Sequence, residues 1–168
     1  MKFVILKGTM ASGKSTAFHN LKKMNEMKDW LFIDFPAIKQ IFNNLSDEER
    51  KKLGKLAFFS ILKEIIPLNK NIITEEISRE AIQREFGEEL IKYYYQIKVF
   101  EFGVSPGESY KRNIKRSVEK GLNPMSRKDM NEALLARKIE EDAVLITTDN
   151  LSELEIVNII LKNLRGKR

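Results

Sequence analysis

Short apolar runs alternate along the chain with longer segments in which apolar residues recur every three or four positions. Five runs are almost wholly apolar and bounded by polar residues, glycine or proline, which is typical of buried strands. These predicted strands span residues 3–6, 30–33, 71–75, 97–102 and 143–147. Because a strand that is apolar on both sides must be covered on both faces, the runs indicate a parallel sheet.

The segments between the runs have helical periodicity and helix end signals. Predicted helices span residues 16–24, 37–44, 46–66, 78–95, 105–121, 126–141 and 151–164. Ser46 begins the longest helix with an N-cap, Pro106 stands in the first turn of a later one, and Ser126 or Asp129 caps the next. The apolar residues of the longest helix are expected to pack in the core: Leu53, Leu56, Ala57, Phe58, Ile61, Leu62 and Ile65.

Alternation of strands with helices predicts an α/β fold, a three-layer α/β/α sandwich around a five-stranded parallel sheet. A chain of 168 residues is long enough to bury a sizeable core, so residues 1–168 are expected to form a single domain. In such sheets ligands lie beyond the carboxyl ends of the strands. Gly8, Asp34, Glu75 and Thr147 stand at these ends and are expected to converge on one rim.

Composition limits the chemistry that the chain can carry. It has no cysteine, which excludes disulfides and thiolate metal sites, and His19 is its only histidine. No apolar run approaches the ~20 residues of a membrane span, and the N-terminal run is too short for a signal peptide. A cytoplasmic protein without a membrane partner is therefore expected. The net charge of +6 suits a polyanionic ligand such as a nucleotide, or nucleic acid.

A complete G-x-x-x-x-G-K-S/T phosphate-binding loop, the Walker A motif, follows the first predicted strand and leads into a predicted helix. Glycine lets backbone amides turn towards phosphates, and the helix N-terminus adds partial positive charge. Lys14 is expected to reach the β- and γ-phosphates, and the Ser15 hydroxyl suits Mg²⁺. The residues expected to bind ATP are Gly8, Met10, Ala11, Ser12, Gly13, Lys14, Ser15 and Thr16.

Acidic residues follow the second and third predicted strands. Asp34 is placed either to take a proton from an acceptor hydroxyl or to cap the helix that follows. Glu75 is the first candidate for an acid that holds the magnesium shell, with Glu76 as the alternative, although both also fit an ordinary acidic turn. Arg79, just beyond, is a candidate for binding an acceptor phosphate or for a surface ion pair.

Residues from about 105 to 128 form a candidate lid. Arg112 and Arg116 stand one helical turn apart, and Arg127 follows a Gly/Asn/Pro loop that permits movement. A closing arginine can stabilise charge on a transferring phosphate and exclude water. Three further lysines make the same helix broadly basic, so a solvated cationic helix is the alternative.

Together these features resemble the small P-loop kinases that include polynucleotide 5′-hydroxyl kinases, zeta-toxin-like kinases and chloramphenicol phosphotransferase. The likeness rests on the phosphate loop, on Asp34, on residues 72–75, and on residues 99–102 leading to residues 110–116. It implies the kinase-type fold of P-loop containing nucleoside triphosphate hydrolases. It also implies that Asp34 is a general base, that Arg112 and Arg116 contact the donor phosphates or adenine, and that Thr148 lies near the adenine.

Two positions depart from the family pattern. Polynucleotide kinases tend to carry an arginine three residues after the base, where this chain has Ala37. Lys39 is a candidate substitute that would offer the acceptor a point charge. The third predicted strand ends in Thr74-Glu75 instead of the usual aspartate. These departures concern the acceptor and the metal rather than phosphoryl transfer itself.

The sequence therefore favours an ATP-dependent kinase that uses Mg²⁺ and transfers the γ-phosphate to a hydroxyl group. The acceptor is left open between a polynucleotide 5′ end, a nucleoside or nucleotide, and another small molecule, and so is the oligomeric state. The alternative is a P-loop ATPase, switch or binding module without kinase activity. A GTPase is disfavoured because residues 69–72, Asn-Lys-Asn-Ile, lack the final aspartate of an N-K-x-D guanine motif.

Overall fold

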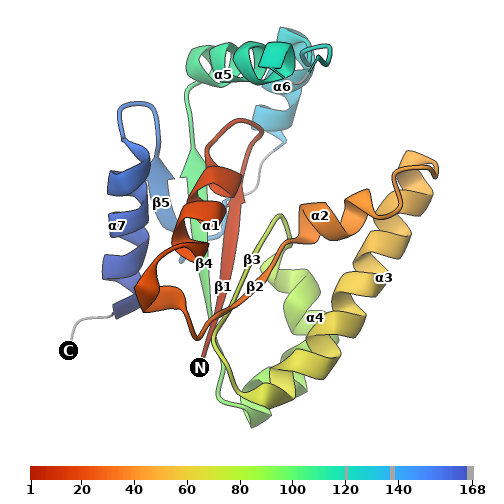
Figure 1. Cartoon of the computed structure of the whole chain (residues 1–168), viewed down its shortest axis with the longest axis vertical. Helices are drawn as coiled ribbons and strands as arrows, with labels where there is room; N and C mark the ends of the chain where they lie inside the picture. Colours follow the sequence, from red (N-terminus) through yellow and green to blue (C-terminus); the bar gives the residue numbers. More distant parts are fainter. Residues whose placement is uncertain (120, 137–138, 166–168) are drawn as a thin grey trace. The chain divides into compact units, whose positions relative to one another are not determined.

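The computed structural model describes residues 1–119, 121–136 and 139–165. Within these residues, strands form one parallel sheet in the order β2-β3-β1-β4-β5 (Figure 1). Each strand lies where an apolar run predicts one, which confirms the predicted sheet. The strands are β1 (Lys2–Gly8), β2 (Leu31–Ile33), β3 (Ile72–Glu75), β4 (Gln96–Gly103) and β5 (Val144–Thr147).

Helices cover both sides of the sheet, as the predicted α/β/α sandwich requires (Figure 1). None of the helices in the described part of the chain is long and apolar enough to cross a membrane. The helices are α1 (Lys14–Lys22), α2 (Phe35–Gln40), α3 (Asp47–Ile65), α4 (Arg79–Lys92), α5 (Pro106–Glu119), α6 (Arg127–Leu135) and α7 (Glu153–Arg165), with short 3₁₀ helices η1 (Asn25–Met27) and η2 (Ile66–Leu68).

The chain divides into two compact units. The first comprises Met1–Leu6 and Lys22–Val99, and the second comprises Lys7–Leu21 and Phe100–Arg168. The first unit therefore contains β2, β3 and helices α2 to α4, and the second contains the phosphate loop, β5, α1 and helices α5 to α7.

In the first unit, β3 pairs with both β1 and β2. The register places Ile72 opposite Phe3 of β1 and opposite Leu31 of β2, and it places Glu75 opposite Leu6. Phe3, Leu6 and Ile72 are fully buried. Burial on both faces of the sheet explains why the sequences of these strands are continuous apolar runs and do not alternate between apolar and polar residues.

Helices α2 and α3 approach each other closely at a glycine. A Cβ on Gly54 of α3 would lie 2.7 Å from Cγ and 3.2 Å from Cα of Lys39 in α2. Next to this contact, Phe58 of α3 is fully buried, and its ring centroid lies 4.9 Å from that of Phe35. Gly54 and Phe58 thus fix how these two helices pack.

Helix end signals were predicted correctly at three places. The Ser46 hydroxyl accepts a hydrogen bond from the Glu49 amide while the Glu49 carboxylate accepts one from the Ser46 amide, which makes a capping box. Pro106 is the first residue of α5. Of the two candidates for the cap of α6, Ser126 is the N-cap, and Asp129 donates its amide to it.

The predicted core face of α3 is partly wrong. Leu56 is 64% exposed and Ile61 is 37% exposed, whereas Gly54, Phe58 and Leu62 are buried. Each residue of a helix is rotated by about 100° from the one before it. Leu56, two residues from both Gly54 and Phe58, therefore lies on the opposite side of α3.

Helices α2, α4 and α6 end at least three residues earlier than predicted. Helix α2 ends at Gln40 and is followed by tight turns in which the amide of residue 43 donates to the carbonyl of residue 40, since asparagine favours turns. Helix α4 ends at Lys92, before Tyr94 takes a left-handed φ of 55°. Helix α6 ends at Leu135, and residues 137–138 of the predicted helix lie outside the described residues.

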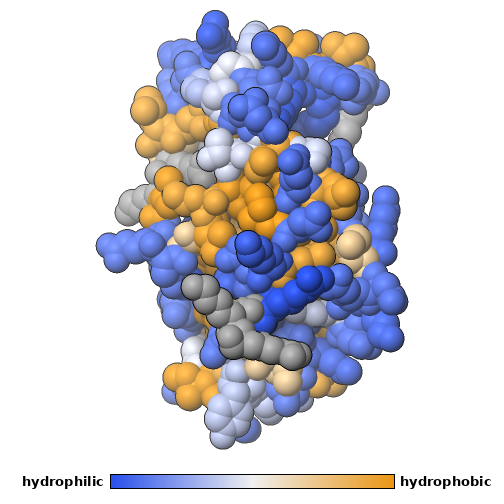
Figure 2. All heavy atoms as spheres, turned by 90° about the vertical axis from the view of Figure 1, so that its left-hand side faces the viewer, coloured by the Kyte–Doolittle hydropathy of each residue, from blue (hydrophilic) through white to orange (hydrophobic). Residues whose placement is uncertain are grey.

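In the second unit, β5 is the edge strand of the sheet. It pairs with β4 so that Ile146 lies opposite Phe102. Ile146 is buried, whereas Leu145, which points to the other face, is 61% exposed. Leu154 of α7 is 64% exposed. Apolar side chains accordingly appear at the surface on the side that carries β5 and α7 (Figure 2).

Phe58 and Leu56 provide a test of this packing. Phe58→Ala is expected to lower the free energy of unfolding by about 3–5 kcal/mol, because it leaves a cavity against the ring of Phe35. Leu56→Ala, on the exposed side of the same helix, is expected to change it by less than about 0.5 kcal/mol. Urea denaturation of the two variants measures both values. Equal losses would contradict the observed orientation of α3.

Candidate active site

The phosphate loop connects β1 to α1 through backbone conformations that most residues avoid. The φ angles are 147° at Gly8, 58° at Ala11 and 91° at Gly13. A Cβ on Gly8 would lie 2.6 Å from the carbonyl oxygen of Phe102. Glycine is therefore required at the first motif position by both the backbone angle and the close approach of β4.

Polar groups of the loop are buried without protein partners. Ser12 is 1% exposed, and its hydroxyl has no hydrogen-bond partner among the described residues. The Thr9 hydroxyl is in the same state. A buried polar group without a partner is costly, so a ligand rich in hydrogen-bond acceptors stabilises this loop. Phosphate oxygens have this chemistry, and the loop fits a nucleoside triphosphate.

Lys14 begins α1, two residues earlier than predicted. It is 7% exposed, and its Nζ donates to the carbonyl oxygen of Thr9 across the loop at 3.1 Å. The first turn of α1 contains no acidic residue, so nothing there opposes the partial positive charge of the helix N-terminus. Ser15 and Thr16 in this turn are exposed, so the Ser15 hydroxyl is accessible to a metal ion.

No group of three or more metal-ligating side chains occurs within residues 1–119, 121–136 and 139–165. Mg²⁺ does not need such a cage, because it commonly takes one or two protein oxygens together with water and substrate phosphate. The Ser15 hydroxyl and the Glu75 carboxylate are oxygen donors of the kind it prefers.

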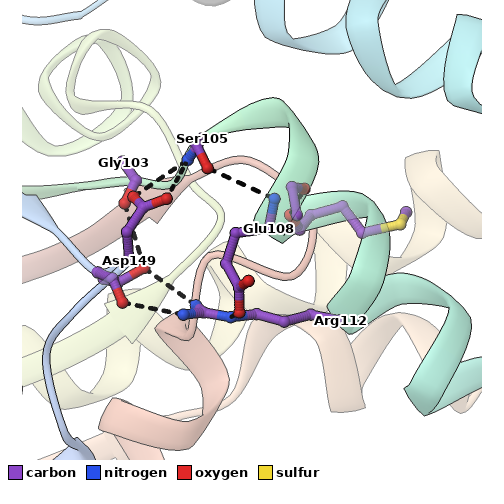
Figure 3. Close-up of polar contacts among 8 residues, drawn as sticks. Gly103, Ser105, Glu108, Arg112 and Asp149 are labelled. Carbon is purple, nitrogen blue, oxygen red and sulfur yellow. Dashed lines mark hydrogen bonds and ion pairs between the residues drawn. The ribbon is translucent and has the colours of Figure 1, made fainter.

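The connections that follow β4 and β5 are joined by a polar network (Figure 3). Both carboxylate oxygens of Asp149 accept from the Ser105 amide, at 3.0 and 3.1 Å. The Thr148 amide and hydroxyl both donate to the carbonyl oxygen of Gly103, at 2.8 and 3.2 Å. Hydrogen bonds from Ser105 hold the pKa of Asp149 below its usual value, and the charge of Arg112 adds to this effect.

Arg112 of α5 is part of the same network (Figure 3). Its Nε donates to Glu108 at 2.9 Å, while Nη1 and Nη2 donate to the hydroxyl and the carbonyl oxygen of Thr148 at 3.1 and 2.9 Å. The structure thus brings together two residues that the sequence analysis assigned separately to the nucleotide. Arg116, one turn further along α5, is exposed.

Helix α5 also contacts the phosphate loop and α6. The Ser109 hydroxyl donates to the carbonyl oxygen of Met10 at 3.1 Å. The guanidinium of Arg127 lies 6.0 Å from the ring centroid of Tyr110. A hollow of about 50 Å³ lies between the loop and these helices, lined mainly by apolar side chains that include Met10 and Met130. The segment predicted to be a lid therefore lies against the phosphate loop.

In the first unit, Asp34 is the N-cap of α2. Its Oδ1 accepts a hydrogen bond from the Ala37 amide at 2.8 Å, which confirms the capping role considered from the sequence. The carboxylate is half-buried and directly follows β2. Its catalytic role stays a prediction.

The two acidic residues at the end of β3 have different surroundings. Glu75 is the last residue of the strand and is 1% exposed. Glu76 follows with a left-handed φ of 63°, its amide donates to the carbonyl oxygen of Leu6, and its carboxylate pairs with Lys39 at 3.0 Å. Arg79 is the first residue of α4 and is partly buried.

The candidate residues are thus divided between the units. Asp34, Lys39, Glu75 and Arg79 belong to the first, and the residues of the loop, lid arginines and Thr148 belong to the second. Sequence reasoning missed the partners of Arg112. The i, i+4 spacing of Glu108 and Arg112 is a signal that could have found one of them. The contact with Thr148, 36 positions away, has no local signal.

The Asp149 network has a pH-dependent consequence. Because the pKa of Asp149 is lowered by folding, its contribution to stability is present above the ordinary value near 3.9 and is lost as the pH falls through the lower folded value. Asp149→Asn is therefore expected to destabilise the protein at pH 7, with a difference from the natural chain that narrows below about pH 4. Denaturation midpoints over a pH series measure this, with exposed Asp29→Asn as the control. A difference independent of pH would contradict it.

Comparison with known proteins finds similarity in structure but not in sequence. No family model matches the chain, and no curated protein matches it. Among the similar solved structures are three that match this chain over nearly the whole length of both chains. A gluconokinase from Sinorhizobium meliloti 1021 is 16% identical with a TM-score of 0.63, covering 98% of this chain and 91% of that one. A shikimate kinase from Acinetobacter baumannii, in complex with shikimate, is 17% identical with a TM-score of 0.62, covering 97% and 92%.

The third structure is Kti12 from Chaetomium thermophilum in complex with ADP-AlF3. It is 13% identical with a TM-score of 0.65, covering 98% of this chain and all of that one. At such low identities the likeness concerns the fold. Together with the parallel sheet and the phosphate loop, it shows that the chain has the α/β/α fold of the P-loop kinases.

Proposed function

We propose that this protein is an ATP-dependent kinase that transfers the γ-phosphate of ATP to a hydroxyl group. The observation that carries the proposal is the phosphate loop, where a buried Ser12 hydroxyl has no hydrogen-bond partner among the described residues and lies close in sequence to Lys14 at the start of α1. The similarity to solved kinase structures supports it.

The loop amides, Lys14 and Ser15 have distinct roles in the proposed reaction. The loop amides and Lys14 hold the donor phosphates, and Lys14 offsets charge that develops on the γ-phosphate. Ser15, with Glu75, would hold Mg²⁺, which neutralises phosphate charge when bound. In the bond exchange, the acceptor oxygen bonds to the γ-phosphorus as the bond to the β-γ bridging oxygen breaks.

Asp34 is proposed to take the proton that the acceptor hydroxyl releases. A carboxylate directly after a strand of a parallel sheet, at the edge where ligands bind, is suited to this work. Lys39 and Arg79 are proposed to contact the acceptor. Arg112, Arg116 and Arg127, on the lid of residues 105–128, are proposed to close over the nucleotide, with Thr148 near the adenine.

A second candidate function is a nucleotide-dependent ATPase or switch. Asp34 favours it, because its Oδ1 is already engaged with the Ala37 amide as a helix cap. If capping is the whole role of Asp34, the chain binds and hydrolyses ATP without a dedicated base for an acceptor.

A transfer assay separates these functions. Purified protein, Mg²⁺ and γ-labelled ATP are offered 5′-hydroxyl oligonucleotides, nucleosides, sugars and aminoglycoside- or phenicol-like alcohols. Label that moves to one class establishes a kinase and identifies its acceptor. Label that moves only to water supports the ATPase, and ATP binding without any transfer supports a binding module.

Lys14→Ala is expected to abolish transfer and to weaken ATP binding by roughly 10- to 100-fold, because it removes a charged hydrogen-bond donor to phosphate. Isothermal titration calorimetry measures the affinity. Lys63→Ala, which removes an exposed lysine of α3, is the control for net charge and should bind ATP normally. Full activity of Lys14→Ala would refute the assignment of the phosphate loop.

Asp34→Asn separates the base from the cap. Asparagine caps a helix about as well as aspartate but cannot accept the proton. The variant is expected to keep its stability and its affinity for ATP while turnover falls by roughly 10²–10⁴-fold. Steady-state kinetics and thermal denaturation measure these effects. Unchanged turnover would leave Asp34 with its capping role alone.

A further inference from the structure

Glu76 takes a backbone conformation that its residue type disfavours. Its φ is 63°, in the left-handed region that glycine and asparagine adopt readily and other residues rarely do. Its amide donates to the carbonyl oxygen of Leu6 at 3.1 Å, so this backbone is fixed against β1. If the position served only as a turn from β3 into α4, glycine would fit it better. The disfavoured backbone therefore suggests that the side chain of Glu76 has a role that glycine could not fill.

The Glu76 carboxylate pairs with Lys39 of α2, with 3.0 Å between Oε2 and Nζ. Lys39 is held from two further sides. Its Nζ lies 4.8 Å from the ring centroid of Phe35, and its Cα and Cγ lie close to Gly54 of α3. Side chains that are restrained in this way lose less conformational freedom when they pair. The pair therefore connects the end of β3 to α2 at a defined point.

Asp34 lies at the start of the same helix. It caps α2 through the Ala37 amide, and α2 is only six residues long. A helix this short has few internal hydrogen bonds to hold its own position, so its contacts with neighbours determine where its N-cap lies. In the described chain, these contacts include the packing against α3 and the ion pair with Glu76.

We propose that Glu76 is a positioning residue, which holds α2 through Lys39 and thereby fixes the carboxylate of Asp34. This inference rests on the proposed kinase function, in which Asp34 is the base, and it adds a residue that positions that base. It also assigns to Glu76 a role different from the magnesium shell for which it was the alternative candidate.

The experiment compares Glu76→Gly with Tyr94→Gly. Tyr94 also has a left-handed φ, of 55°, and its side chain is 84% exposed, so both changes relieve the same backbone conformation. They differ in the side chain that is lost. Amide hydrogen exchange by NMR reports the position of α2 through Ala37, whose amide Asp34 caps. The Glu49 amide, capped by Ser46 in α3, is the internal reference.

Glu76→Gly is expected to speed exchange at Ala37 by about tenfold relative to Glu49, whereas Tyr94→Gly leaves the ratio unchanged. Lys39→Met should have the same effect as Glu76→Gly, and the double variant should exchange no faster than either one, because both remove the same link. An unchanged ratio in Glu76→Gly, an equal change in Tyr94→Gly, or additive effects in the double variant would overturn the proposal.

The transfer assay supplies the second readout. Glu76→Gly is expected to lower kcat by about tenfold or more while KM for MgATP stays unchanged, because Asp34 is displaced and the phosphate loop is not. Normal kcat in Glu76→Gly would overturn the positioning role even if exchange at Ala37 rises. If the natural chain transfers no label to any acceptor, the proposed kinase function fails, and the exchange ratio alone decides whether Glu76 positions Asp34.

Discussion

The phosphate loop depends on the backbone of Gly8 passing closer to β4 than a side chain would permit. The carbonyl oxygen of Phe102 occupies the space where a Cβ would be, and the hydroxyl of Ser12 lies on another side of the same position. This close passage lets the loop fold back over the end of β1 and present its interior to a ligand. The hydroxyls of Thr9 and Ser12 are buried in the same loop, and neither has a hydrogen-bond partner among the described residues.

Elsewhere in the molecule, acidic residues that follow strands make structural contacts. Asp34 caps α2, Glu76 joins β3 to α2, and Asp149 fixes the amide of Ser105. Asp34 and Asp149 accept from backbone amides near the start of a helix, which would otherwise lack a partner within that helix, and Glu76 pairs with a lysine side chain. Asp34, the proposed base, is therefore held in place by a hydrogen bond that also stabilises the start of α2.

Much of this architecture could be predicted because the signals are local. Five apolar runs marked the strands, and Ser46, Pro106 and Ser126 marked helix starts. The ends of α2 and α4 were wrong, since turn hydrogen bonds and a left-handed Tyr94 compete with continued helix there. The exposed side of α3 was missed because helical periodicity shows only that Leu56 could pack against another element. It does not show which elements lie next to the helix.

The site could be predicted only in part for a related reason. The phosphate loop is contiguous in sequence, so residue types and spacing alone predicted a strand, a glycine-containing loop and a helix at this place. Arg112 was predicted to be functional, and its hydrogen bonds to Thr148 had no sequence signal, because they depend on how β4, β5 and α5 come together over 36 positions. The left-handed conformation of Glu76 likewise had no sequence signal, because glutamate is not a residue that marks such a turn.

A ligand that binds Arg112 must first compete with the hydrogen bonds that this side chain makes within the protein. Its guanidinium donates to Glu108 and twice to Thr148, so these three bonds must break before it can reach a phosphate. The free energy needed to break these bonds reduces the free energy of ligand binding. The apparent dissociation constant equals the intrinsic one divided by the fraction of molecules in which Arg112 is released. A ligand that offers a full negative charge compensates for the exchange, whereas a neutral one does not. If Arg112 binds the ligand as proposed, the network would therefore favour highly charged ligands over less charged molecules of similar shape.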